Sequence, residues 1–497
     1  MSTKLFFDTL PSTVKVADVN FEQSVETEIL LADYDAPVFK IVKTTLEHLI
    51  TQKYVMQGKL TVEGFVKVNI CYQSSENCRL HSVSQKIPFQ KQLEIGQHEG
   101  EFISLQGYCQ YVNTRPQNPT RIDVRGAYMF NVRVFAAQNT QVVTAVASDS
   151  VCCDSTQIDC FSMSTHNSRQ FNIEQPLALA ANTARILRIA TDVSTPSVTV
   201  YADKIAVKGE IGGDIYYTVD DDDEVHCQSQ AFAYNQLVDM KNIKENNVPF
   251  VRLSVTSLGV AQNSEDKKLT AVITVQIDAV SFAKQQIISV RDVFSRRYLY
   301  TKQVANQLVD ANVHIINKNF SLQFGDVVTA GQKICDVYFE ISPAKSYYEI
   351  NKMTVKSKIF AHIITRNNQN EYECITKTED IVADWLENCG RHDEICMDLS
   401  VVGYSCSDSG LTVNISAKGF VIEKHQVELM AAFEENCDKP QQNVKEALVV
   451  YYGKKGDRVF DIAKNHNVSP QIIAEENLLE TDSLVEDSML FIPVFEQ

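Results

Sequence analysis

Long runs of alternating apolar and polar residues dominate this chain, and such spacing predicts β-strands with one buried face. Each long run is followed by a shorter run of the same kind. Few stretches show the three-to-four-residue apolar spacing of a long helix. The long runs lie at residues 122–135, 269–282 and 411–422, and the shorter ones at 142–146, 287–294 and 427–433.

The body of the chain repeats one pattern three times. Matching hexapeptides begin at Lys59, Lys204 and Lys352. Each leads into an alternating run, and the three runs end at Tyr72, Tyr217 and Thr365. Several matched anchors in the same order indicate internal repeats. We therefore expect a mainly β protein with three tandem antiparallel β-sandwich-like domains, at residues 14–153, 168–300 and 318–436.

Units of about 145 residues are large enough to fold independently, unlike short solenoid repeats. We expect linkers between them near residues 154–167, 296–318 and 434–445, where polar residues accumulate. Residues 298–313 also suit a short helix.

The last fifty residues follow a different order. A turn at residues 454–457 precedes helical apolar spacing from Val459, and Ser469 with Pro470 opens a second short helix. A short strand then runs to Pro493. This order predicts a small βααβ domain at residues 447–495.

Charge and composition exclude several classes of function. The net charge is −17, so long-range repulsion disfavours nucleic acid and anionic membranes. No segment reaches the roughly 18 apolar residues of a membrane span, and the first residues lack a signal-peptide core. Thirteen cysteines include no C-x-x-C pair, which disfavours structural zinc and a disulfide scaffold. We expect a reduced, cytosolic protein.

Candidate catalytic chemistry is weak throughout. The acidic run at residues 220–224 lacks the spacing of an EF-hand and suits a solvated hairpin tip. His81 and His226 occupy equivalent places, but Glu373 stands there in the third repeat, which disfavours a shared catalytic or metal role. No phosphate-binding loop, zinc-protease motif or nucleophile elbow is present. We expect no enzymatic activity, no cofactor and no metal.

The tail resembles a LysM domain: a tyrosine-ended strand, Gly456-Asp457, a helix, Val468-Ser469, an E-N-L helix end and Leu490 to Pro493. LysM domains generally bind N-acetylglucosamine-containing glycans between two loops, and the resemblance places a groove there. Two departures alter it: Arg458 replaces the usual Thr, and an acidic turn replaces Pro-Gly. The altered, charged groove favours a protein partner. Its expected contact residues are Lys454, Lys455, Gly456, Asp457, Arg458, Phe460, Glu476, Asn477, Glu486 and Asp487.

The three-unit body resembles tandem SPOCS domains, the spore-coat module of sporulating Firmicutes. The resemblance rests on the strands ending at Tyr72 and Tyr217 and on the heptapeptide at residues 292–298, and it is weakest in the third unit. SPOCS units followed by a LysM domain resemble the SipL-like family of spore coat morphogenetic proteins of clostridia.

This resemblance implies a protein of the mother-cell cytoplasm that lies on the forespore surface, within the spore coat. It also implies a partner, the basal coat-layer ATPase of the SpoIVA type, with the LysM domain as a main contact, and possibly other coat proteins. The alternative is a glycan-binding module that targets peptidoglycan of the cortex or cell wall. A LysM-targeted hydrolase is a third class, for which the repeats share no catalytic residues.

Overall fold

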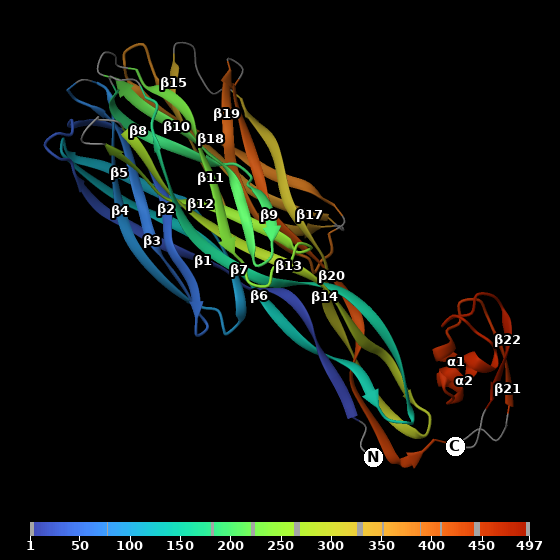
Figure 1. Ribbon diagram of the computed structural model, residues 1–497. Coiled ribbons are helices and arrows are strands. Elements are labelled where there is room, and N and C mark those ends of the chain that lie inside the picture. Colours follow the sequence, from blue (N-terminus) through green and yellow to red (C-terminus); the bar gives the residue numbers. More distant parts are fainter. Residues whose placement is uncertain are drawn as a thin grey trace.

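The computed structural model describes residues 4–76, 78–179, 183–219, 224–262, 269–325, 332–349, 352–387, 389–407, 410–441 and 448–493. It confirms a mainly β fold with two short helices near the C-terminus. The predicted hairpin tip at residues 220–224 lies mostly outside the described residues. Figure 1 shows an elongated body with a small domain beside one end.

The first repeat sets the plan of the body. Its first, fifth and sixth strands form a long sheet in the order β1–β6–β5. Its second, third and fourth strands form a short sheet in the order β2–β3–β4. All of these pairs are antiparallel. The strands are β1 (Lys4–Leu30), β2 (Val38–Met56), β3 (Lys59–Ser74), β4 (Leu80–Glu94), β5 (Glu99–Asn118) and β6 (Arg121–Ala147).

The second repeat has the same plan, with the sheets β12–β13–β7 and β11–β10–β8. The counterpart of β2 is divided in two at Pro196, where a proline cannot donate to a sheet ladder. The strands are β7 (Val151–Pro176), β8 (Thr183–Val193), β9 (Ser197–Tyr201), β10 (Lys204–Val219), β11 (His226–Asp239), β12 (Val248–Gln262) and β13 (Leu269–Ser295).

The third repeat forms the sheets β14–β20–β19 and β15–β17–β16, with β18 paired to β17. Its second strand is again divided, here at Pro343. The strands are β14 (Tyr298–Phe324), β15 (Lys333–Ile341), β16 (Lys345–Glu349), β17 (Lys352–Arg366), β18 (Tyr372–Glu387), β19 (Glu394–Ser407) and β20 (Gly410–Pro440). The register also supports the predicted equivalences, since Tyr72 faces His81, Tyr217 faces His226 and Thr365 faces Glu373.

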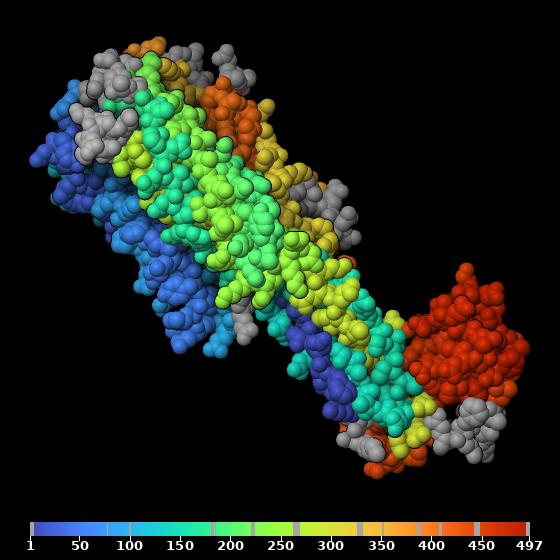
Figure 2. Space-filling model, in the orientation of Figure 1, coloured from blue at the N-terminus to red at the C-terminus, as the bar shows by residue number. Residues whose placement is uncertain are grey.

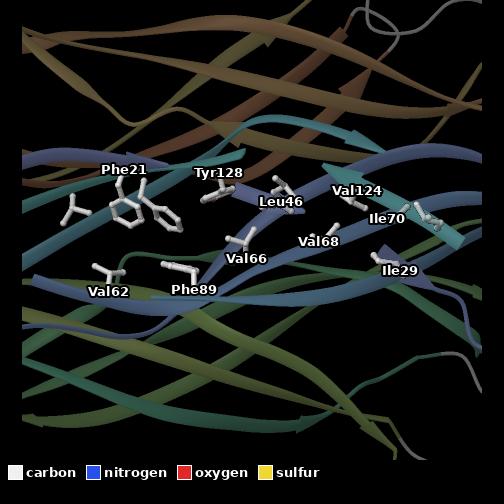
Figure 3. Close-up of a cluster of buried hydrophobic side chains, with 14 of the residues drawn as sticks. Phe21, Ile29, Leu46, Val62, Val66, Val68, Ile70, Phe89, Val124 and Tyr128 are labelled. Carbon is white, nitrogen blue, oxygen red and sulfur yellow. The ribbon is translucent and has the colours of Figure 1, made fainter. Parts of the chain in front are cut away.

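Each repeat buries its alternating apolar face between its long and short sheets, as the sandwich prediction requires. In the first repeat, Figure 3 shows Val62, Val66 and Val68 of β3 opposite side chains of the long sheet. Phe21 stacks on Phe130 with 4.8 Å between ring centroids. These residues are nearly or fully removed from water, so each contributes about 1.5–3 kcal/mol of burial.

The three repeats also share a core. Phe420 of β20 is fully buried and packs against aromatic rings from both other repeats. The ring centroids of Phe135 and Phe282 lie 5.3 and 5.1 Å from that of Phe420. The repeats are therefore packed side by side around a common centre.

Beyond this centre, the long strands continue as a narrow arm, which we call the stem. It comprises residues 4–13, 138–147, 151–163, 282–295, 298–310 and 424–440. One buried cluster takes a side chain from each of the six strands: Leu10, Val142, Ile158, Ile287, Val309 and Leu429. At about 3.3 Å per residue, a 27-residue strand such as β13 spans about 90 Å, which accounts for the elongated shape in Figure 1.

The stem corrects the linker prediction. Residues 154–167 lie within β7, and most of residues 296–318 lie within β14, which also excludes the short helix at 298–313. Residues 434–440 belong to β20, and residues 442–447 lie outside the described residues. Many of the polar residues that suggested linkers are outward-facing positions of these strands, whereas Ser162 and Asp310 are buried. The exact domain boundaries stay a prediction.

Candidate partner-binding site

The tail folds into the predicted strand–helix–helix–strand order. Gly456 has a φ of 94°, which only glycine adopts readily, and so lets the chain turn into the first helix. Asn467 ends that helix in the left-handed conformation, and Pro470 begins the next helix. The elements are β21 (Leu448–Gly453), α1 (Val459–His466), α2 (Pro470–Glu476) and β22 (Ser488–Pro493).

Two loops of the tail are joined by hydrogen bonds at the end of the two-stranded β21–β22 sheet. The Lys455 amide donates to Asp487 Oδ1 at 2.8 Å, and the Gly456 amide donates to the Leu484 carbonyl at 2.8 Å. The Leu484 amide in turn donates to the Asp457 carbonyl at 2.9 Å. The acidic turn before β22 therefore holds the turn before α1, where the sequence placed the two walls of a groove.

The predicted contact residues divide into three groups according to what they touch. Six of them remain exposed and carry mixed charge, with two lysines and three carboxylates. They are Lys454, Lys455, Gly456, Glu476, Glu486 and Asp487.

Asp457 and Asn477 hold the tail together. Asp457 Oδ2 accepts a hydrogen bond from the Lys454 amide at 2.8 Å. Asn477 donates to the Ile473 carbonyl and to the Phe491 carbonyl, both at 2.8 Å, and accepts from the Phe491 amide at 2.7 Å. Asn477 thus fastens the end of α2 to β22.

Arg458 and Phe460 face the stem. The Arg458 guanidinium lies 2.6 Å from Asp154 Oδ2 of β7. The Phe460 ring meets Phe294 of β13 edge-on, with 5.2 Å between centroids. Phe460 is buried, and Phe294 belongs to the same buried cluster as the core of the tail. Figure 2 shows the tail seated against the end of the stem.

A second ion pair strengthens this contact. Lys464 Nζ lies 2.6 Å from Asp292 Oδ2 of β13. Burial disfavours the charge on Lys464, but its hydrogen bond to Asp292 raises the net pKa of Lys464 above its usual value. The hydrogen bond to Asp154 likewise raises the pKa of Arg458. Both tail cations therefore stay charged while they lie on the stem.

Each stem carboxylate serves two cations. Asp154 pairs with Arg291 of the stem at 2.6 Å as well as with Arg458. Asp292 contacts Lys302 of the stem as well as Lys464. Burial alone would raise the pKa of Asp292, but hydrogen bonds from the two lysines lower it overall. The stem thus presents two anions beside an aromatic ring.

Lys464, Asp154, Asp292 and Phe294 were not among the predicted site residues. One signal was available, because Phe460 and Lys464 are four residues apart and so share a helix face. A second was the heptapeptide at 292–298, which contains Asp292 and Phe294. Nothing in the sequence paired these positions with the tail.

The face of the β21–β22 sheet that points away from the helices is apolar. Figure 1 shows α1 and α2 on the stem side of the tail, with β21 and β22 on the far side. Outward residues of a two-stranded sheet are normally polar, yet here they are aliphatic, aromatic or Met and 40–76% exposed. We call this surface the outer face: Leu448, Val450, Tyr452, Met489 and Phe491. None of these five residues was among the contact residues predicted from the sequence.

Within the described residues, no group of three or more His, Cys, Asp or Glu side chains is placed to hold a metal ion. Among those residues, too, no helix is long and apolar enough to cross a membrane. His81 and His226 each stack on the facing tyrosine, with centroid distances of 5.7 and 5.6 Å. Their environment is that of paired strand residues.

Comparison with known protein families agrees with this division of the chain. Residues 37–115 and 183–262 match the SipL, SPOCS domain family, and residues 454–493 match the LysM domain family. The first two segments lie in corresponding parts of the first and second repeats, from β2 to β5 and from β8 to β12. No curated protein and no solved structure matches the chain.

Proposed function

From its SipL-like architecture, SPOCS domains followed by a C-terminal LysM domain, we propose that this chain is a non-enzymatic spore coat assembly protein. SPOCS and LysM are non-catalytic domain families, and together they fit a sporulation coat protein with a possible cell-wall-binding module. In this proposal the protein acts in the mother-cell cytoplasm, on the forespore surface. The stem and the β-sandwiches act as a scaffold and spacer in the coat. The LysM domain docks on the basal coat ATPase of the SpoIVA type.

The observation that carries protein docking is the outer face. Aromatic, aliphatic and Met side chains at 40–76% exposure have the composition of a protein–protein interface core. The exposed loop charges of Lys454, Lys455 and Glu486 adjoin its end at Tyr452 and would form a polar rim. Apolar centre and charged rim together suit a protein surface better than a neutral sugar chain.

Pull-down of the purified basal coat ATPase by the full-length chain tests this proposal. Val450→Lys places a charge in the outer face and should reduce binding at least tenfold, because a charge would be buried without a partner. Val382→Lys is the matched control, since Val382 is similarly exposed (55% against 45%) on β18 of the third repeat. Equal binding by both variants would refute docking through this face.

The second candidate is peptidoglycan binding, which the LysM family match favours. Sedimentation of the full-length chain with purified peptidoglycan separates the two functions. Salt-independent co-sedimentation that survives Val450→Lys would favour the glycan module.

A further inference from the structure

The stem covers one side of the groove that the LysM resemblance implies. Arg458 and Phe460 stand where the sequence placed one side of the groove, and both contact the stem. In the same domain, Lys454, Lys455 and Glu486 remain exposed. The contact therefore separates the LysM surface into a covered part and an open part.

We propose that the end of the stem is an intramolecular docking site that masks the Arg458–Phe460 wall of the LysM domain, so that binding to this wall requires release of the domain. Phe294 supplies the apolar seat, and Asp154 and Asp292 supply an anion on either flank for Arg458 and Lys464. The coupling to a partner rests on the proposed function and takes the Arg458–Phe460 wall as a second partner contact beside the exposed outer face. The docking on the stem does not rest on the proposed function.

The chemistry of the contact suits a reversible latch. Its ion pairs are partly solvated, since the Arg458 and Lys464 side chains are 34% and 27% exposed. Solvated pairs of this kind are weak and are screened by salt. Each stem anion also keeps a cation of its own, Arg291 or Lys302, when the LysM cation leaves. Release therefore leaves neither Asp154 nor Asp292 without a cation.

The sequence separates the LysM domain from the body by a short segment. Strand β20 ends at Pro440 and β21 begins at Leu448, so seven residues join the two. An extended chain of that length reaches about 25 Å, enough for the domain to leave the stem without unfolding β20 or β21.

The test compares ¹H–¹⁵N spectra of the full-length chain with those of D154N/D292N, which removes both anions and keeps side-chain size. A LysM domain held rigidly within the 55.9 kDa chain gives broad signals, whereas a released domain gives narrow, dispersed ones. Weakening two solvated pairs should favour release by about threefold to thirtyfold. The matched control is D159N, because Asp159 pairs with Lys284 on the same stem strands at 3.0 Å without touching the tail.

We expect broad LysM signals in the wild type and D159N, and narrow ones both in D154N/D292N and in R458Q/K464Q, which removes the two tail cations and leaves the stem unchanged. Narrow signals in the wild type, or broad signals in D154N/D292N, would overturn the docking proposal. R458Q/K464Q controls for damage to the stem, because it weakens the same two ion pairs from the tail side alone.

Pull-down of the coat ATPase by the same proteins tests the coupling. We expect D154N/D292N to bind it threefold to thirtyfold more tightly than the wild type and D159N to match the wild type. Release without tighter binding would overturn the coupling. If no protein binds, the proposed function fails and the coupling with it, while the spectra still decide the docking.

Discussion

Replacing Phe420 with alanine should destabilise all three repeats together. Phe420 belongs to the third repeat, is fully buried, and packs on Phe102 and Phe135 of the first repeat and Phe250 and Phe282 of the second. A buried Phe→Ala change costs about 3–5 kcal/mol, and aromatic pairs add about 0.5–1.5 kcal/mol each. With four ring neighbours we expect a loss of at least about 5 kcal/mol in the free energy of unfolding.

The assay is guanidinium unfolding followed by far-UV circular dichroism and by fluorescence of Trp385, the single tryptophan, which lies in β18 of the third repeat. Both signals should shift together in F420A. The companion variant is F232A, because Phe232 is fully buried within the core of the second repeat alone. If the repeats unfold as one unit, F232A also lowers the Trp385 midpoint.

An unchanged Trp385 midpoint in F232A would refute this reasoning. So would F420A if its two signals separate into distinct transitions. Either result would favour the independently folding tandem domains that the sequence pattern suggested.

Three further predictions concern pH, the LysM fold and the thiols. Burial, and then the nearby charge of Lys53, lower the pKa of His48 from 6.5 to about 4. Between pH 6.5 and 4 the unfolded chain therefore takes up a proton on His48 that the folded chain does not. The free energy of unfolding should fall by roughly 3 kcal/mol as the pH drops from 6.5 to 4. H48Q should flatten this pH dependence in guanidinium unfolding. Asn477→Ala removes three hydrogen bonds and should cost the LysM domain about 2 kcal/mol, seen as earlier proteolysis of the tail; an unchanged digestion rate would contradict this. In timed alkylation read by mass spectrometry, we expect exposed thiols, those of Cys78, Cys227, Cys406 and Cys437, to react before buried ones, those of Cys71, Cys160, Cys389 and Cys396. Reaction of the buried thiols in the folded protein would contradict the packing.

The strands and the repeat could be predicted because their signals are local. Alternation over residues 59–72 and its two counterparts follows directly from one buried face per strand, and the structure pairs the predicted equivalents Tyr72–His81 and Tyr217–His226. The tail was equally readable, because Gly456 and Pro470 mark a turn and a helix start by their own backbone chemistry.

The stem was missed because its pairing is not local. Residues 154–167 look polar, since only Ile158, Cys160, Phe161 and Met163 among them pack against a buried hydrophobic cluster, and polar residues stand between most of these positions. Whether such a stretch is a linker or a strand depends on the β13 residues opposite it, more than a hundred positions away.

The same limit applies to the site. Asp154 and Arg458 stand 304 positions apart, and no spacing rule connects them. The outer face was missed for another reason. Leu448, Val450 and Tyr452 alternate with inward residues, and the pattern alone does not say which of two apolar faces is covered.

The central claim is that the LysM domain of this chain docks a protein. The most direct measurement is a pair of affinities for the same purified full-length chain, one for the basal coat ATPase and one for purified peptidoglycan, each repeated with Val450→Lys. We expect the ATPase to be bound at least tenfold more tightly than peptidoglycan and the substitution to remove that preference. Tighter binding to peptidoglycan, unaffected by the substitution, would contradict it.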